Sequence, residues 1–314
     1  KNIVIGWKAG LGGSGDMSDS IAIGDNAMDG TGTLDALSNI FIGRDAGGGT
    51  WTTTGSSQNV GIGNYVMDGA LNDADNNVAV GHNALTALTT GDENVCLGAY
   101  AGDEITTHSQ NTLMGYAAGH RVTANGNVLI GYLAGDNVTT GASNTGVGTN
   151  VAFDIDADNQ IAIGNEATTS AANAVKIGNG SISAANIQVD WTIDSDIRIK
   201  KDVEDNTLGL SFINSLKPKK YRKLHPADWD KEIREKRYEK GERDEFDDVK
   251  VWDGLIAQDV KESIDESGTT FSGWSEDANG KQGIQYSAMV VPLIKAVQEL
   301  SAEVKQLKQQ LEDK

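Results

Sequence analysis

Ser195 and Lys200 lie five residues apart in this 314-residue chain, and a serine and a lysine that meet can act as a nucleophile and its base. A serine hydroxyl is a poor nucleophile until a base removes its proton. A lysine can be that base once burial or nearby positive charge favours its neutral form, and Arg198 and Lys201 are close enough in sequence to supply such charge. The alternative is structural, because a Ser-Asp pair is a common helix N-cap and a lone lysine is a common surface residue.

The spacing of five residues restricts how this pair can meet. Residues five apart do not stack on one face of a helix, and they lie on opposite faces of a strand. The pair therefore requires a turn between Ser195 and Lys200, or a lysine that reaches over from another chain.

Metal chemistry has less support in the sequence. Asp154, Asp156 and Asp158 alternate as in a calcium loop, but Asn159 stands where the turn glycine should be and no glutamate follows at the twelfth position. His82, His108 and His120 are isolated and show no paired ligand spacing. We therefore predict no metal and no cofactor.

The chain that must position these residues divides in composition near residue 194. Residues 1–194 carry a net charge of −15 and 31 of the 38 glycines, whereas residues 195–314 carry −4 and all three prolines. The overall acidity argues against nucleic acid as a partner, because phosphate contacts need Lys and Arg. No apolar run is long enough for a membrane helix, and the single cysteine excludes a disulfide framework within one chain.

The first part is a repeat array. A pentapeptide that ends in glycine recurs eleven times at intervals of 14–20 residues, with Ala or Val three residues after most of the glycines. The copies end at Gly6, Gly24, Gly43, Gly63, Gly81, Gly98, Gly115, Gly131, Gly148, Gly164 and Gly178.

Each pentapeptide predicts a short strand. Its second and fourth positions are nearly always Ile, Val or Leu, which we assign to one buried face, while the variable middle position points elsewhere. One such coil cannot bury an apolar face alone, but stacked coils can, so we predict a β-roll or β-helix. Because the stripe of two apolar side chains per coil is thin, association of several chains would help to complete the core.

The pattern over residues 1–180 resembles the left-handed β-roll head of trimeric autotransporter adhesins, whose repeat reads Asn-x-Val-Ala-Ile-Gly. Such stacks serve as shafts, spacers and receptor-binding heads. Cys96 occupies a variable middle position and is expected to be a small packed thiol. Tyr116 and Tyr132 directly follow repeat glycines, so they either form an exposed ladder that meets a carbohydrate or, as we favour, pack between coils or subunits.

The C-terminal end predicts a parallel coiled coil over about 288–312. Apolar residues there alternate in steps of three and four, and Lys and Glu surround them, which leaves dimer and trimer open. The seam comprises Val290, Leu293, Val297, Leu300, Val304, Leu307 and Leu311. Residues 251–260 are strand-like and then helical, and the charge-rich segment 230–248 is expected to be a solvated helix or loop.

Residues 195–314 resemble the intramolecular chaperone, auto-processing domain at the C-termini of phage endosialidases, tailspikes and tail fibres. Four stretches carry the resemblance in order: SDIRIKKD at 195–202, GLSFINSLKPKKY at 209–221, GLIAQDV at 254–260 and YSAMVVPLIKAVQEL at 286–300. The resemblance implies a trimer, a chaperone that aligns three fibre chains, and single-turnover self-cleavage by a Ser-Lys dyad. Ser195 and Lys200 match that dyad by position, which places the cleaved bond between Asp194 and Ser195.

We therefore expect a mainly β repeat (1–180), a linker (181–194) and an α+β chaperone domain (195–314) that ends in a trimeric coiled coil. The leading function is a phage tail-fibre or tailspike fragment, assembled as a homotrimer in the host cytoplasm and extracellular in the virion. A host cell-surface receptor or glycan is a candidate partner, and we expect no membrane insertion. Because the chain starts inside a repeat, we interpret it as part of something longer.

Two other functions compete with this interpretation. The first is a bacterial trimeric surface adhesin whose C-terminal part is a trimerisation clamp that does not cleave. The second is an enzyme that acts on polysaccharide, which would need clustered carboxylates, and the repeats offer no carboxylate pair to nominate.

Overall fold

The computed structural model describes most of the chain as two compact units, Lys1–Asn179 and Gly180–Lys314, which we treat separately. The described residues are 1–12, 15–182, 185–186, 188, 192–234, 238, 243, 249–277 and 279–313. Most of the segment 230–248 and part of the expected linker 181–194 lie outside them.

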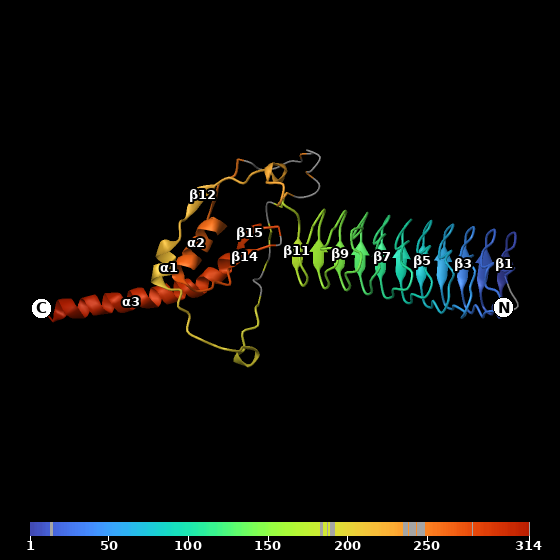
Figure 1. Ribbon diagram of the computed structural model, residues 1–314, viewed down its shortest axis with the longest axis horizontal. Coiled ribbons are helices and arrows are strands. Elements are labelled where there is room, and N and C mark those ends of the chain that lie inside the picture. Colours follow the sequence, from blue (N-terminus) through green and yellow to red (C-terminus); the bar gives the residue numbers. More distant parts are fainter. Residues whose placement is uncertain are drawn as a thin grey trace. The chain divides into compact units, whose positions relative to one another are not determined.

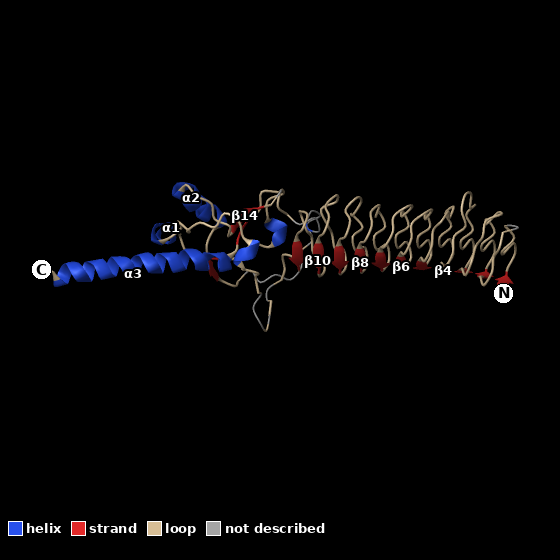
Figure 2. Ribbon diagram, turned by 90° about the horizontal axis from the view of Figure 1, so that it is seen from below, coloured by secondary structure: helices blue, strands red, loops and turns tan. Residues whose placement is uncertain are grey.

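The first unit is a β-solenoid with one strand for each predicted repeat. Its eleven strands form a single parallel sheet in sequence order, so that each coil pairs with the next in register (Figure 1). Figure 2 shows that the strands line one side of the solenoid while turns form the rest of each coil. The strands are β1 (Ile3–Ile5), β2 (Ile21–Ile23), β3 (Ile40–Ile42), β4 (Val60–Ile62), β5 (Val78–Val80), β6 (Val95–Leu97), β7 (Thr112–Met114), β8 (Val128–Ile130), β9 (Thr145–Val147), β10 (Ile161–Ile163) and β11 (Val175–Ile177).

The expected orientation of the strands was wrong. From β2 to β10 the middle residue of each strand is buried inside the coil, while the flanking Ile and Val residues are half-buried or exposed on the outer face of the sheet. The interior is shared with the Ala or Val three residues after most repeat glycines, and its middle residues range from Ala79 and Cys96 to Phe41 and Leu129. The two flanking rows are named here the aliphatic rows.

A ladder of buried amides holds the coils in register. From Asn39 to Gln160 the first residue of each pentapeptide is fully buried. The Oδ1 atom of each Asn accepts a hydrogen bond of 2.9–3.0 Å from the backbone N–H of the equivalent residue in the next coil. The residue before this Asn has a positive φ, for example Glu93 before Asn94.

The repeat glycine is required by close backbone approach. Gly98 has φ +143°, and a Cβ atom there would overlap the carbonyl group of Gly115 in the next coil. The other repeat glycines from Gly6 to Gly148 meet the following coil in the same way. Only glycine combines that backbone conformation with that spacing.

The second unit is a small α+β region. Two antiparallel pairs, β12–β13 and β14–β15, accompany helices α1 and α2, whose apolar faces meet around Phe212, Val260 and Phe271. The elements are the 3-10 turn η1 (Ile197–Ile199), α1 (Leu210–Ser215), β12 (Lys219–Tyr221), η2 (Pro226–Asp228), β13 (Trp252–Gly254), α2 (Ala257–Ser267), β14 (Trp274–Glu276), β15 (Gln282–Ile284), η4 (Tyr286–Met289) and α3 (Val290–Glu312). The predicted change from strand to helix over residues 251–260 is confirmed by β13 and α2.

Helix α3 includes all of the predicted heptads in one unbroken helix, and the side chains of its seam are exposed. It packs on α1 through its buried residues Pro292 and Ala296, and the Glu299 carboxylate accepts a 2.7 Å hydrogen bond from the backbone N–H of Leu210. All seven seam residues from Val290 to Leu311 are exposed. The helix therefore does not use its heptad face to pack on its own domain.

Candidate active site at the Ser195–Lys200 turn

A single turn brings the two candidate catalytic side chains together. The Nζ atom of Lys200 donates a 2.7 Å hydrogen bond to the Oγ atom of Ser195. The 3-10 turn η1 lies between them, and the backbone N–H of Lys200 bonds to the carbonyl oxygen of Ile197. This geometry supplies the turn that a spacing of five requires, and it does so within one chain.

The N-cap of η1 is Asp196 and not Ser195. The Asp196 carboxylate accepts a 2.9 Å bond from the backbone N–H of Arg198, which satisfies one of the free donors of the turn. The hydroxyl of Ser195 is therefore not needed as the cap and is left to pair with Lys200.

The charges near the dyad are compensated by acids, contrary to the expectation that they assist Lys200. The Arg198 guanidinium binds both carboxylate oxygens of Asp196, with nitrogen–oxygen distances of 2.6–3.1 Å. These bonds lower the pKa of Asp196 and raise the pKa of Arg198. The Nζ atom of Lys201 lies 3.8 Å from the Oδ2 atom of Asp202. The nearest cations therefore contribute little net positive charge at Lys200.

The whole segment around the dyad is open to solvent in the single chain. Every described residue from Thr192 to Thr207 is exposed, including Asp194, Ser195 and Lys200. Two of the large apolar side chains in this segment, Ile197 and Ile199, are each 66% exposed although they stand between the serine and the lysine. The pair has the hydrogen bond of a dyad but not the burial that lets a lysine act as a base.

The other candidates from the sequence have structural roles. Asp156 accepts bonds from the hydroxyls of Thr139 and Thr140, and Asp158 accepts one from the backbone of Ala142. Among the described residues, no group of three or more His, Cys, Asp and Glu side chains is placed to hold a metal. Cys96 is fully buried, and burial raises the pKa of its thiol.

The aromatic residues that follow the repeat glycines form a continuous ladder along five coils. Neighbouring ring centroids lie 5.5–5.8 Å apart, and the Tyr116 and Tyr132 rings are stacked. The ladder comprises Tyr65, His82, Tyr100, Tyr116 and Tyr132. The rings thus pack between coils of one chain, and Tyr116 and Tyr132 also remain about half exposed.

The comparison with known families identifies the segment that carries the dyad. Residues 195–269 match the family model Peptidase_S74, described as chaperone of endosialidase. The match begins at Ser195 and includes Lys200, α1 and α2. No curated protein and no solved structure gave a significant match.

Over residues 195–269 the match confirms the resemblance stated from the sequence motifs, and the fourth motif, at 286–300, lies outside the matched residues. The segment that matches this family model follows a β-solenoid, and the name Peptidase_S74 implies autoproteolytic activity. None of the helices in the described part of the chain is apolar and long enough to span a bilayer.

Sequence reasoning missed two features of this site. It treated Arg198 as a free cation, although Asp196 two residues earlier is an obvious partner once a turn is assumed. It also gave no role to Ile197 and Ile199, whose signal is an apolar residue on each side of Arg198 in an otherwise polar segment.

Proposed function

We propose that this chain is part of a phage tail fibre or tailspike whose C-terminal unit aligns three chains and then removes itself by cleavage between Asp194 and Ser195. The observation that carries the proposal is the hydrogen bond between Lys200 Nζ and Ser195 Oγ, at the first residue of the segment that matches the endosialidase chaperone family. The mature fibre would remain in the virion and meet a host-surface receptor or glycan.

The aliphatic rows support self-association of the solenoid. They run along the whole sheet from β1 to β11, with side chains such as Ile62, Val80 and Ile130 more than one-third exposed. Monomeric proteins rarely leave a contiguous apolar surface of this extent open. Burial of the rows between chains would give each solenoid a second core, on the outer face of its strands.

The exposed seam of α3 supports the same conclusion for the second unit. Apolar side chains at heptad spacing bury themselves when helices supercoil around one another. The heptads are compatible with two or three helices, and the family resemblance favours three.

The trimer is tested by charge placed at the seam. Leu300→Asp with Leu307→Asp should prevent helix association and leave the solenoid misassembled or aggregated, because the chaperone could no longer align the chains. Gln306→Asp with Gln309→Asp is the matched control off the seam. These measurements use chains that also carry Ser195→Ala, which keeps them uncleaved. Light scattering should then give three times 33.1 kDa for the chain with Ser195→Ala alone and for the control. Correct assembly of the seam variant would reject the chaperone role.

The proposed cleavage uses only groups of the turn and one water. The Ser195 hydroxyl attacks the carbonyl carbon of Asp194 while Lys200 takes the hydroxyl proton. Lys200 then returns a proton to the backbone nitrogen of Ser195 as the carbon–nitrogen bond breaks, which leaves an ester between Asp194 and the serine oxygen. Water hydrolyses the ester, so the products are a fibre that ends at Asp194 and a chaperone that begins at Ser195.

The cleavage is tested by two variants that spare the folding surfaces. Ser195→Ala removes the nucleophile and Lys200→Ala removes the base, so each should yield a full-length trimer. Intact mass spectrometry after incubation should show two fragments for wild type and one chain for each variant. Fragments from Ser195→Ala, or a wild-type trimer that stays whole, would reject the assignment. The second result would leave a clamp that does not cleave.

A further inference from the structure

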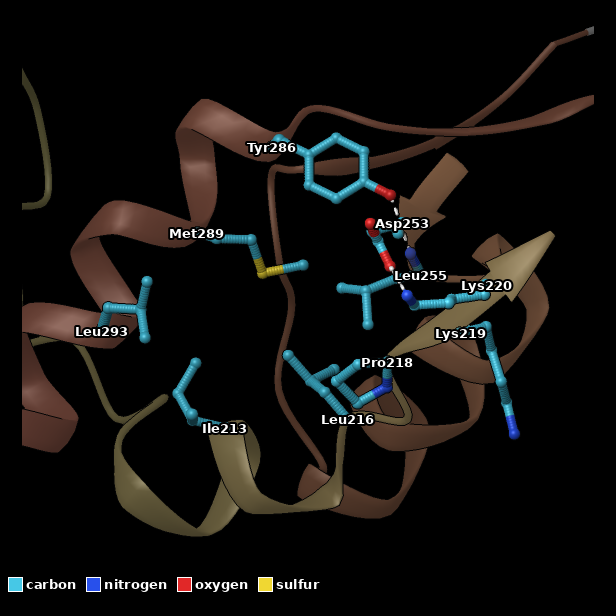
Figure 3. A pocket seen from close by; sticks show the side chains of 11 residues that line it. Ile213, Leu216, Pro218, Lys219, Lys220, Asp253, Leu255, Tyr286, Met289 and Leu293 are labelled. Carbon is cyan, nitrogen blue, oxygen red and sulfur yellow. Dashed lines mark hydrogen bonds and ion pairs between the residues drawn. The ribbon is translucent and has the colours of Figure 1, made fainter. Parts of the chain in front are cut away.

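The second unit contains an apolar cavity that the proposed cleavage does not use. Its volume is about 600 Å³, which is within the range of ligand pockets. Figure 3 shows the side chains of Ile213, Leu216, Leu255, Met289 and Leu293 converging on it from α1 and its C-cap, the segment before α2, η4 and α3. One wall is braced by a 2.8 Å bond from the backbone N–H of Leu255 to the Tyr286 hydroxyl.

The cavity is continuous with the seam of α3. Leu293 lines the cavity and is also a seam residue. The cavity therefore opens beside the surface that the proposed function assigns to neighbouring chains, and its occupant should belong to a second copy.

The rim of the cavity is basic on the side of β12. Lys219, Lys220 and Asp253 all line it, and Lys220 Nζ lies 3.8 Å from Asp253 Oδ1, so the rim carries a surplus of one positive charge. Lys219 has no ion-pair partner among the described residues. An occupant that combines aliphatic side chains with flanking carboxylates would complement both the cavity and this rim.

The segment around the dyad has this composition. Ile197 and Ile199 are exposed, and residues 194–204 carry four carboxylates and three cations, which gives the segment a net charge of −1. The segment is anchored at the buried Leu208, nine residues after Ile199, which allows a reach of roughly 30 Å in extended chain. It is therefore long enough to leave its own chain and contact a neighbour.

We propose that Ile197 and Ile199 of one chain dock into the apolar cavity of a second copy, and that this docking activates the dyad. The inference rests on the proposed function and explains how cleavage is coupled to assembly. Ser195 and Lys200 flank the two isoleucines, so any surface that covers the isoleucines also removes water from the dyad. Removal of water from the dyad favours the neutral form of Lys200.

The first test removes the aliphatic side chains without adding charge. Ile197→Ser with Ile199→Ser changes only exposed residues, so the trimer should form as in wild type by light scattering. Cleavage should slow by at least about tenfold, because the apolar burial that drives docking is lost. Ile197→Val with Ile199→Val should restore most of the rate, and Leu224→Ser, at an exposed leucine outside the segment and the cavity, should not change it.

The second test separates docking between chains from docking within one chain. Leu216→Arg blocks the cavity but keeps the dyad, whereas Ser195→Ala keeps the cavity but lacks the nucleophile. Neither chain should be cut alone, and the Leu216→Arg chain should be cut when the two are refolded together. Ile213→Arg serves the same purpose if Leu216→Arg does not fold. A mixture that stays whole would overturn docking between chains.

Failure of the docking and failure of the cleavage itself give different results. A wild-type trimer that stays whole rejects the proposed cleavage, and the activation role falls with it. A wild type that is cut, together with an Ile197→Ser and Ile199→Ser variant that is cut at the same rate, rejects the docking alone.

Discussion

At the scale of residues, the Ser195–Lys200 pair shows how far spacing can be interpreted. A spacing of five residues meant that the two side chains could not lie on one face of a helix or of a strand. The structure supplies instead a 3-10 turn whose N-cap is Asp196. The electrostatics could not be predicted from sequence distance, because Arg198 is equally close to Lys200 and to Asp196. The bidentate bond to Asp196 decides between them, since a paired guanidinium repels a nearby lysine less.

Asp68 in the solenoid permits a prediction about pH. Burial and then the carboxylates of Asp45 and Asp29 raise the pKa of Asp68 from 3.8 to about 6. The folded chain then holds a proton that the unfolded chain has released, so this contribution to stability is full below about pH 4 and is lost as pH rises through about 6.

The substitution Asp68→Asn removes this dependence. It should stabilise the solenoid at pH 7.5 by about 1 kcal/mol after allowance for solvent screening, and change little at pH 4. Thermal unfolding at both pH values checks this, with Asp154→Asn at an exposed carboxylate as the control. Destabilisation by Asp68→Asn at pH 7.5 would show that the three carboxylates do not repel one another as described.

At the scale of elements, the strands show what a repeat pattern leaves open. Alternation establishes that the two faces of a strand differ, but a period of two does not say which face meets the core. We assigned the Ile and Val rows to the interior because they are apolar and regular. The structure places Ala22, Phe41 and Cys96 inside instead, where they pack with residues from the turns. The variability of the middle position was a sign of local packing and not of exposure.

The repeat glycine gives a prediction at the same scale. Gly98→Ala adds a Cβ atom that overlaps the carbonyl of Gly115 and imposes an unfavourable φ, so the solenoid should lose several kcal/mol or fail to fold. Gly268→Ala, at the C-cap of α2, has φ +67° and nothing within 4 Å, so its cost should stay near 1 kcal/mol. Chemical denaturation of both variants provides the comparison, and equal costs would contradict the close approach between coils.

At the scale of the whole molecule, both units expose apolar surface in ordered rows, along the sheet of the solenoid and along α3. The motifs predicted the repeats, the terminal helix and the segment that matches the endosialidase-chaperone family. They could not predict the cavity or the uncovered isoleucines, which depend on how residues distant in sequence meet.

The aliphatic rows can be tested separately from the chaperone. Val80→Lys with Ile130→Lys changes residues that are exposed in the single chain, so each coil should still fold. The lysines should prevent solenoids from associating, because burial of a charge without a partner is costly. Thr54→Lys with Thr107→Lys adds the same charge elsewhere on exposed coil positions as the control. Analytical ultracentrifugation of the full-length chain should show fewer trimers for the first pair than for the control pair, and equal trimer content in both would mean that the rows are not an interface.

The central claim is that this chain assembles first and then cuts itself at Asp194–Ser195. The most direct measurement follows one refolding sample over time by light scattering and by intact mass. The account predicts a full-length trimer that appears first and then converts to two fragments, with the break directly before Ser195. Fragments that appear while the chain is still monomeric, or a break at any other bond, would contradict it.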